Sequence, residues 1–171
     1  MLALPAFSAL AGLDTGTLAP DFDLQAAQAG QVFRFSLREA LARGPVVLYF
    51  FPAAYSEGCS IEAHTFAEAI ADFRAAGASV LGVSADDIPT LTSFSQQACQ
   101  GKFPVASDAD QRVMKSYDAV MQTRPDFATR ISFVIAPDGR IAYTYKNLEP
   151  TRHVERTLTA VRQLTRVAAA K

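Results

Sequence analysis

The sequence predicts an α/β sandwich built on a mixed central β-sheet. The runs VVLYFF (46–51) and SVLGVS (79–84) are rich in β-branched and apolar residues, which is typical of strands covered on both faces. Segments with helical periodicity alternate with them. Near the C-terminal end, ISFVIA and RIAYTY flank the tight turn PDG, which indicates an antiparallel hairpin.

The N-terminal part predicts a strand and a short helix. LAPDFDL (18–24) is typical of extended chain after a turn, and QVFRFSL (31–37) alternates apolar and polar residues as a strand does. Ser36 followed by Glu39 fits a capping box for a helix at 37–42. The Gly-Pro pair after that helix should end it.

Four further helices follow from spacing and stop signals. One spans about 57–76 and is ended by Gly77. A second covers 88–99, where a proline fits the first turn, and a third covers 110–120. From Thr151 on, apolar residues recur at helical spacing and predict an amphipathic C-terminal helix: Val154, Leu158, Val161 and Leu164.

Length, composition and charge limit the possible classes of protein. The 171 residues favour one domain, expected at 16–171 after an apolar extension at 1–15. A net charge of −1 gives no electrostatic reason to expect nucleic acid or an anionic membrane as partner. The longest apolar run, 45–55, is too short to span a bilayer. We expect a cytoplasmic protein, or a periplasmic one if Met1 to about Leu13 belongs to a signal peptide.

The two cysteines, Cys59 and Cys99, lie 40 positions apart and each needs its own explanation. Cys59 comes at the start of a helix, on the same face as Phe66. A helix N-terminus and nearby cations lower the pKa of a thiol, so the position suits a nucleophile. A buried core residue is the alternative reading, because cysteine is often simply buried.

The neighbours of Cys59 carry further chemistry in the pattern P-x-x-x-S-x-x-C. Pro52 ends the strand and can wall off a pocket, while Ser56 can cap the helix or direct its hydroxyl at whatever meets the sulfur. Glu62 shares the face of Cys59, and a buried carboxylate needs a cation. Arg130, which opens the strand at 131–136, is the candidate cation, although a solvated strand-edge charge is the plain alternative.

These motifs together resemble the peroxiredoxin family, in particular the type called peroxiredoxin Q or bacterioferritin comigratory protein. The resemblance runs from Gly16 onward and rests on five stretches: LAPDFDL, VVLYFFPAAYSEGCSIEA, VLGVSADD, KFPVASDAD and RISFVIAPDGRIAY. It implies a thioredoxin-like three-layer α/β/α sandwich with an N-terminal β-hairpin. It also implies thiol-dependent reduction of hydrogen peroxide and alkyl hydroperoxides. We expect no cofactor.

The resemblance also implies a role for each site residue. Cys59 is the peroxidatic cysteine, whose thiolate attacks the peroxide and becomes a sulfenic acid. Ser56, where the family more often has threonine, binds the peroxide, and Pro52 shields the sulfur from water. Arg130 stabilises the thiolate and the developing charge, and Glu62 holds Arg130 in place.

The resolving step is where this chain departs from the family pattern. Many members have the resolving cysteine five residues after the peroxidatic one, and this chain has His64 there. Cys99 is the only other thiol, so an intramolecular Cys59–Cys99 disulfide is expected, formed after local unwinding. Resolution by an external thiol, with Cys99 a bystander, is the alternative. The usual reductant in the family is thioredoxin.

Other residues receive simpler interpretations. His64 and His153 are expected on the surface, and the cysteines and histidines lack the paired spacing of a zinc site. Three aromatic residues are candidates for an apolar entrance to the site: Tyr49, Phe51 and Phe127. The last residues contain no cysteine, so we expect a monomer or a weak homodimer rather than a dimer with exchanged tails.

Two rival functions share the predicted fold. A thioredoxin-like disulfide oxidoreductase typically uses C-x-x-C, but Glu62 stands where its second cysteine would be. A non-catalytic binding module would leave Cys59 with ordinary thiol reactivity.

Overall fold

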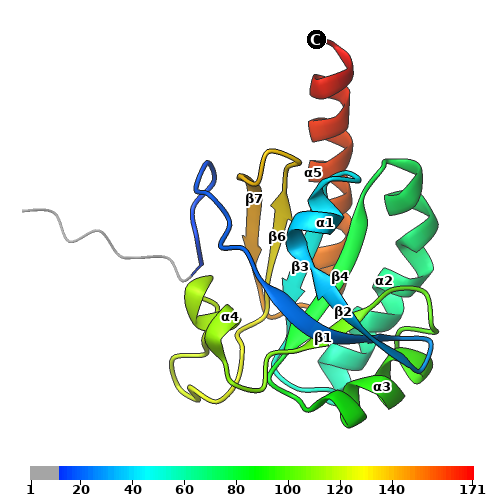
Figure 1. The fold of residues 1–171 in the computed structure, drawn as a ribbon, viewed down its shortest axis with the longest axis vertical. Coiled ribbons are helices and arrows are strands. Elements are labelled where there is room, and N and C mark those ends of the chain that lie inside the picture. The colour runs from blue at the N-terminus through cyan, green and yellow to red at the C-terminus, as the bar shows by residue number, and fades with distance from the viewer. Residues whose placement is uncertain (1–11) are drawn as a thin grey trace, which may run out of the picture.

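A seven-stranded mixed sheet between two layers of helices forms the molecule (Figure 1). The computed structural model describes residues 12–171. The strands lie in the order β2-β1-β5-β4-β3-β6-β7, and β3, β4 and β5 run parallel. The other neighbouring pairs are antiparallel. The expected sandwich with a mixed sheet is therefore confirmed.

The elements have the following bounds. The strands are β1 (Asp23–Gln28), β2 (Gln31–Ser36), β3 (Val46–Phe50), β4 (Ser79–Ser84), β5 (Val105–Ser107), β6 (Ile131–Ile135) and β7 (Ile141–Lys146). The helices are α1 (Leu37–Leu41), α2 (Glu57–Ala75), α3 (Ile88–Gln97), α4 (Arg112–Ser116) and α5 (Thr151–Ala169).

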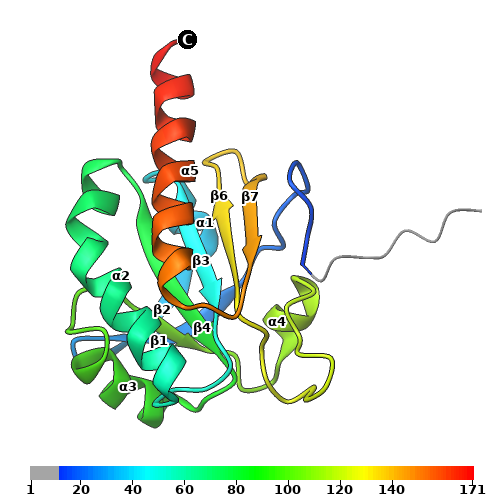
Figure 2. The ribbon, with the colours of Figure 1, turned by 180° about the vertical axis from the view of Figure 1, so that it is seen from behind.

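Strand β3 lies inside the sheet and divides the core in two. All five of its residues are buried, and successive side chains point to opposite faces. Leu48 and Phe50 pack on the side of α1 and α4, whereas Val47 and Tyr49 pack on the side of α2, α3 and α5. Figure 2 shows α2 and α5 side by side over this second face. This burial on both faces explains why the run VVLYFF is apolar throughout.

The N-terminal β-hairpin is present as β1 and β2. A two-residue loop, Ala29 and Gly30, joins them, and both residues have positive φ, as in a type I′ hairpin turn. Strand β1 also pairs with β5 and so attaches the hairpin to the main sheet. Neither β1 nor β5 is signalled as a strand by its sequence, because DLQAAQ lacks β-branched residues and VAS is only three residues long.

One expected helix is much shorter than predicted, whereas another has nearly its predicted bounds. The helix expected at 110–120 is only Arg112–Ser116, and the residue Asp118 has a φ of 50°, which does not continue a helix. Asp108 instead organises this segment, because its carboxylate accepts hydrogen bonds from the backbone N–H groups of Val113 and Met114. Helix α2 has nearly its expected bounds, and Gly77 follows it with a φ of 80°.

The expected N-terminal extension, 1–15, falls mostly outside the described residues, as does the expected signal-peptide remnant. Residues 12–15 already contact the folded body, since the hydroxyl of Thr144 donates a 2.8 Å hydrogen bond to the carbonyl of Leu13. None of the helices in the described part of the chain is long and apolar enough to cross a membrane.

Candidate active site

Cys59 lies in the first turn of α2, where the chain re-enters the core after β3. Its side chain is 1% exposed and belongs to the core on the α2 side of the sheet. The connecting loop is fastened by Asp86, whose carboxylate accepts 2.7 Å hydrogen bonds from the backbone N–H of Ala54 and from the hydroxyl of Ser84. The sulfur is therefore held at the positive end of a helix dipole. Asp86 had not been singled out from the sequence.

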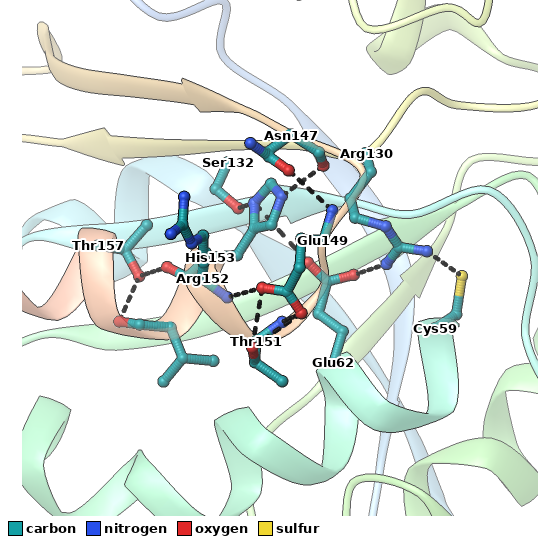
Figure 3. Close-up of polar contacts among 11 residues, drawn as sticks. Cys59, Glu62, Arg130, Ser132, Asn147, Glu149, Thr151, Arg152, His153 and Thr157 are labelled. Atoms are coloured by element: carbon teal, nitrogen blue, oxygen red, sulfur yellow. Dashed lines mark hydrogen bonds and ion pairs between the residues drawn. The ribbon is translucent and has the colours of Figure 1, made fainter. Parts of the chain in front are cut away.

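Arg130 joins Cys59 to Glu62, as Figure 3 shows. Its Nη2 donates to Sγ of Cys59 at 3.5 Å, and its Nη1 donates to Oε2 of Glu62 in a buried ion pair. The interpretation of Arg130 as a solvated strand-edge charge is wrong, because the residue is only 8% exposed.

Gly58 lies close against the guanidinium of Arg130. A Cβ atom at this position would lie 2.9 Å from Nη2 of Arg130, which is closer than carbon and nitrogen tolerate. The glycine before the cysteine therefore leaves room for the guanidinium beside the sulfur.

Burial disfavours the charged forms of Glu62 and Arg130, whereas the attraction between the two residues favours them. Burial raises the pKa of Glu62, and the attraction of Arg130 only partly offsets that rise. Burial also works against the charge on Arg130, but Glu62 and Cys59 together hold its pKa above the ordinary value. The guanidinium thus stays charged and, among residues 12–171, is the cation in contact with both groups.

His153 lies behind Glu62, fully buried, so its expected place on the surface is wrong. Its Nδ1 lies 2.7 Å from the hydroxyl of Ser132 and 3.8 Å from Oε1 of Glu62, and its Nε2 lies 2.8 Å from the carbonyl of Asn147 (Figure 3). One signal could have revealed it: His153 stands four and eight residues before the buried Thr157 and Val161, on one helix face.

Ser56 and Pro52 lie in the loop that leads to Cys59. Ser56 is the N-cap residue of α2, but its side chain does not cap the helix. Its hydroxyl instead donates a 3.0 Å hydrogen bond to the carbonyl of Ala53 and is exposed. Pro52 is half-buried at the end of β3. The roles assigned to both residues toward a peroxide stay predictions.

Cys99 is buried two residues after the end of α3, and both thiols are free. Burial raises the pKa of Cys99 well above its ordinary value, so this residue is a protonated thiol in the folded, reduced protein. The neighbouring Gln100 contacts α2, since its amide Nε2 lies 2.8 Å from Nδ1 of the exposed His64. The segment that carries Cys99 is thus attached to the helix that carries Cys59.

The expected apolar entrance is wrong for two of its three residues. Tyr49 and Phe51 are fully buried, and Tyr49 stacks on Phe66 with ring centroids 4.5 Å apart. Only Phe127 is partly exposed, with the guanidinium of Arg124 over its ring. The apolar run VVLYFF could not show this, because strand alternation alone does not separate an entrance from a core.

Within residues 12–171, no group of three or more His, Cys, Asp or Glu side chains is arranged to hold a metal ion. What the site offers is a thiol at a helix N-terminus with a guanidinium in contact. A cation in contact with the sulfur is a feature of sites where cysteine acts as a nucleophile.

Comparisons with known proteins agree with this geometry. The model of the AhpC/TSA family matches residues 15–144. A Mycobacterium tuberculosis protein named as a peroxiredoxin is 34% identical over 148 residues, which are 83% of this chain and 90% of that protein. The chloroplastic peroxiredoxin Q of Oryza sativa subsp. japonica is 30% identical over 152 residues, 87% of this chain and 67% of that one.

The fold has close counterparts among solved structures. The crystal structure of peroxidoxin BcpB from Mycobacterium tuberculosis superposes with a TM-score of 0.79 at 27% identity, covering 88% of this chain and 97% of that one. This likeness confirms the thioredoxin-like fold. The chain therefore belongs to the AhpC/TSA family and, within it, to the peroxiredoxins of the Q and Bcp type.

Proposed function

We propose that this chain is a thiol-dependent peroxidase that reduces hydrogen peroxide and alkyl hydroperoxides through Cys59. The observation that carries the proposal is the contact between Arg130 and both Cys59 and Glu62, inside a protein of the peroxiredoxin family. The names of its relatives support thiol peroxidase activity.

The chemistry follows from the thiolate. Sγ of Cys59 attacks the terminal oxygen of the hydroperoxide, the O–O bond breaks, and that oxygen stays on sulfur as a sulfenic acid. The leaving alkoxide, or hydroxide, takes up one proton and departs as an alcohol or water. Arg130 stabilises the thiolate and the charge that develops on the oxygens. Ser56 turns its hydroxyl from the carbonyl of Ala53 to the peroxide, and Pro52 shields the sulfur.

Cys99 resolves the sulfenic acid in this proposal. Its sulfur attacks Sγ of Cys59, the S–O bond breaks, and one water leaves as the Cys59–Cys99 disulfide forms. Because Cys99 is buried and its pKa is raised, the step needs local opening around the end of α3 and the start of α2. A thiol reductant of the thioredoxin type then restores both thiols by disulfide exchange.

Resolution by an external thiol is the second candidate. The same burial of Cys99 favours it, because a fully buried thiol reacts only as fast as the structure opens. In that case only Cys59 is oxidised and reduced in each turnover, and Cys99 is a core residue.

The compartment we propose is the cytoplasm.

The test is peroxide consumption with thioredoxin, thioredoxin reductase and NADPH, and separately with dithiothreitol. We expect NADPH oxidation that depends on peroxide and disappears in Cys59→Ser. In Cys99→Ser we expect activity with dithiothreitol to persist and activity with thioredoxin to fall at least about tenfold, since dithiothreitol can attack the sulfenic acid directly. Full thioredoxin-linked activity in Cys99→Ser would instead establish the one-cysteine mechanism.

A further inference from the structure

A groove of about 240 Å³ lies between the β1–β2 hairpin, the start of β4 and the end of α2. Strand β5 pairs with β4 only over Gly82–Ser84. The preceding residues of β4 therefore have no neighbouring strand on that side, and two of them, Ser79 and Val80, line the groove instead. The short β5 thus leaves a gap in the surface of the fold.

The lining of this groove is largely apolar. Phe35, Ile70 and Phe103 are buried at its base. Phe33 also lines it, but this residue lies on the edge strand β2 and is 41% exposed. An exposed aromatic ring beside buried apolar residues offers surface that an apolar ligand can remove from water.

Three cations line the same groove: Arg43 after α1, Arg74 in the last turn of α2 and Lys102 before β5. Within residues 12–171 none of them forms an ion pair, and no Asp or Glu belongs to the lining. The cavity beside α1 differs, because Asp21 and Asp138 line it. The groove at the end of α2 therefore carries positive charge that no neighbouring carboxylate balances.

Arg74 is already oriented for an anion. Its Nη2 donates a 2.9 Å hydrogen bond to the carbonyl of Lys102, which fixes the guanidinium without neutralising it. A guanidinium has five N–H donors, so others remain for a ligand. Because part of the side-chain entropy is already lost, a carboxylate can bind here by charge-assisted hydrogen bonds at a smaller entropic cost.

We propose that this groove binds a small amphipathic anion, with its carboxylate among Arg43, Arg74 and Lys102 and its apolar body over Phe33. An inorganic anion would leave the aromatic ring exposed, and a neutral apolar molecule would leave the cations without a partner. The site is separate from the peroxidatic centre, because Arg74 lies at the opposite end of α2 from Cys59, about 22 Å along the helix axis. The inference does not rest on the proposed peroxidase function.

The test is isothermal titration calorimetry of the reduced full-length protein with octanoate. Octanol, which has the same chain without the charge, and inorganic phosphate, which has the charge without the chain, are titrated beside it. We expect saturable binding of octanoate to one site, at least about tenfold tighter than the binding of either comparison compound.

Substitutions locate the bound octanoate. Arg74→Ala removes a charge-assisted partner and should weaken binding about tenfold. Arg43→Ala and Phe33→Ala should also weaken it, and the side chain of Arg43 makes no hydrogen bond among the described residues whose loss could disturb the fold. Arg166→Ala on α5 is the matched control, since it removes an exposed arginine without an ion pair that lies outside the groove. Its affinity should stay within about twofold.

Each outcome decides the proposal. Binding that weakens in Arg74→Ala and Phe33→Ala but not in Arg166→Ala would support it. The absence of saturable octanoate binding, equal affinity for octanol or phosphate, or an equal loss in Arg166→Ala would overturn it. A dimer in analytical ultracentrifugation that Phe33→Ala dissociates would show that a second copy covers the groove, and would also overturn the proposal.

Discussion

At the scale of single residues, the site depends on how closely one guanidinium can approach one sulfur. A Cβ atom at Gly58 would require Nη2 of Arg130 to shift, and the guanidinium is held in place by its ion pair with Glu62. Each of these residues does one geometric task, so substitutions should separate catalysis from stability.

Gly58→Ala is the sharpest such substitution. Alanine favours helix over glycine by up to about 1 kcal/mol, so we expect α2 and the whole protein to be as stable or more stable. The new methyl group displaces Nη2 of Arg130, and the rate constant with hydrogen peroxide should fall about tenfold or more. Stopped-flow kinetics and urea unfolding measure the two effects.

Ser60→Ala is the control for that experiment. It lies in the same turn of α2, and its side chain makes no hydrogen bond among the described residues. The rate should stay within about twofold, because a 0.4 kcal/mol change in a barrier is about a factor of two. A Gly58→Ala protein with an undiminished rate would show that the position of Arg130 does not limit catalysis.

At the scale of elements, α2 positions Cys59, and the turn after α3 positions Cys99. That turn has two consecutive residues with positive φ, Gln100 and Gly101, immediately after Cys99. The contact between Gln100 and His64 connects it to α2. This contact must break if the end of α3 opens to bring Cys99 to Cys59.

We therefore expect Gln100→Ala to accelerate disulfide formation. One hydrogen bond stabilises the closed turn by about 0.5–1.5 kcal/mol, so its loss should speed the step about 2- to 10-fold. His64→Ala should have the same effect, and the double variant should be no faster than either single one. The rate is followed by quenching the peroxide-treated protein and separating its oxidised form. Unchanged or slower rates would mean that this contact does not restrain opening.

The elements also show what sequence can and cannot determine. VVLYFF predicts a two-faced strand because its burial is a local property of composition, and Cys59 and Glu62 share a face because three residues are nearly one helical turn. Strand β5 was missed because a three-residue strand exists only through its neighbours. His153 was missed because a histidine is buried only when distant groups satisfy it, here Asn147 and Ser132.

At the scale of the whole molecule, the buried imidazole of His153 makes the free energy of unfolding depend on pH. The pKa of His153 falls from 6.5 to about 4 on folding, mainly because burial disfavours the charged ring. Since the folded pKa is lower than the unfolded one, the unfolded chain binds a proton first as the pH drops. The contribution of His153 to stability is thus full above about pH 6.5 and is lost progressively as the pH falls toward 4.

We expect this group to cost about 2 kcal/mol of unfolding free energy between about pH 7.5 and pH 5. Urea unfolding at both pH values measures the loss, and His153→Asn, which cannot titrate there, should show about 2 kcal/mol less of it. His64→Asn is the control, because His64 is exposed and forms an ion pair with Glu68 only when it is protonated. Equal pH dependence in the His153→Asn and unsubstituted proteins would mean that His153 does not stay neutral in the fold.

The most direct measurement is the intact mass of the reduced protein after one equivalent of hydrogen peroxide, with Cys59→Ser and Cys99→Ser beside it. A two-cysteine peroxidase loses two hydrogens, and either substitution abolishes that loss. Cys99→Ser should instead gain oxygen on Cys59, because its sulfenic acid has no internal partner. If the unsubstituted protein keeps its mass while free peroxide remains in solution, Cys59 is not a peroxidatic cysteine.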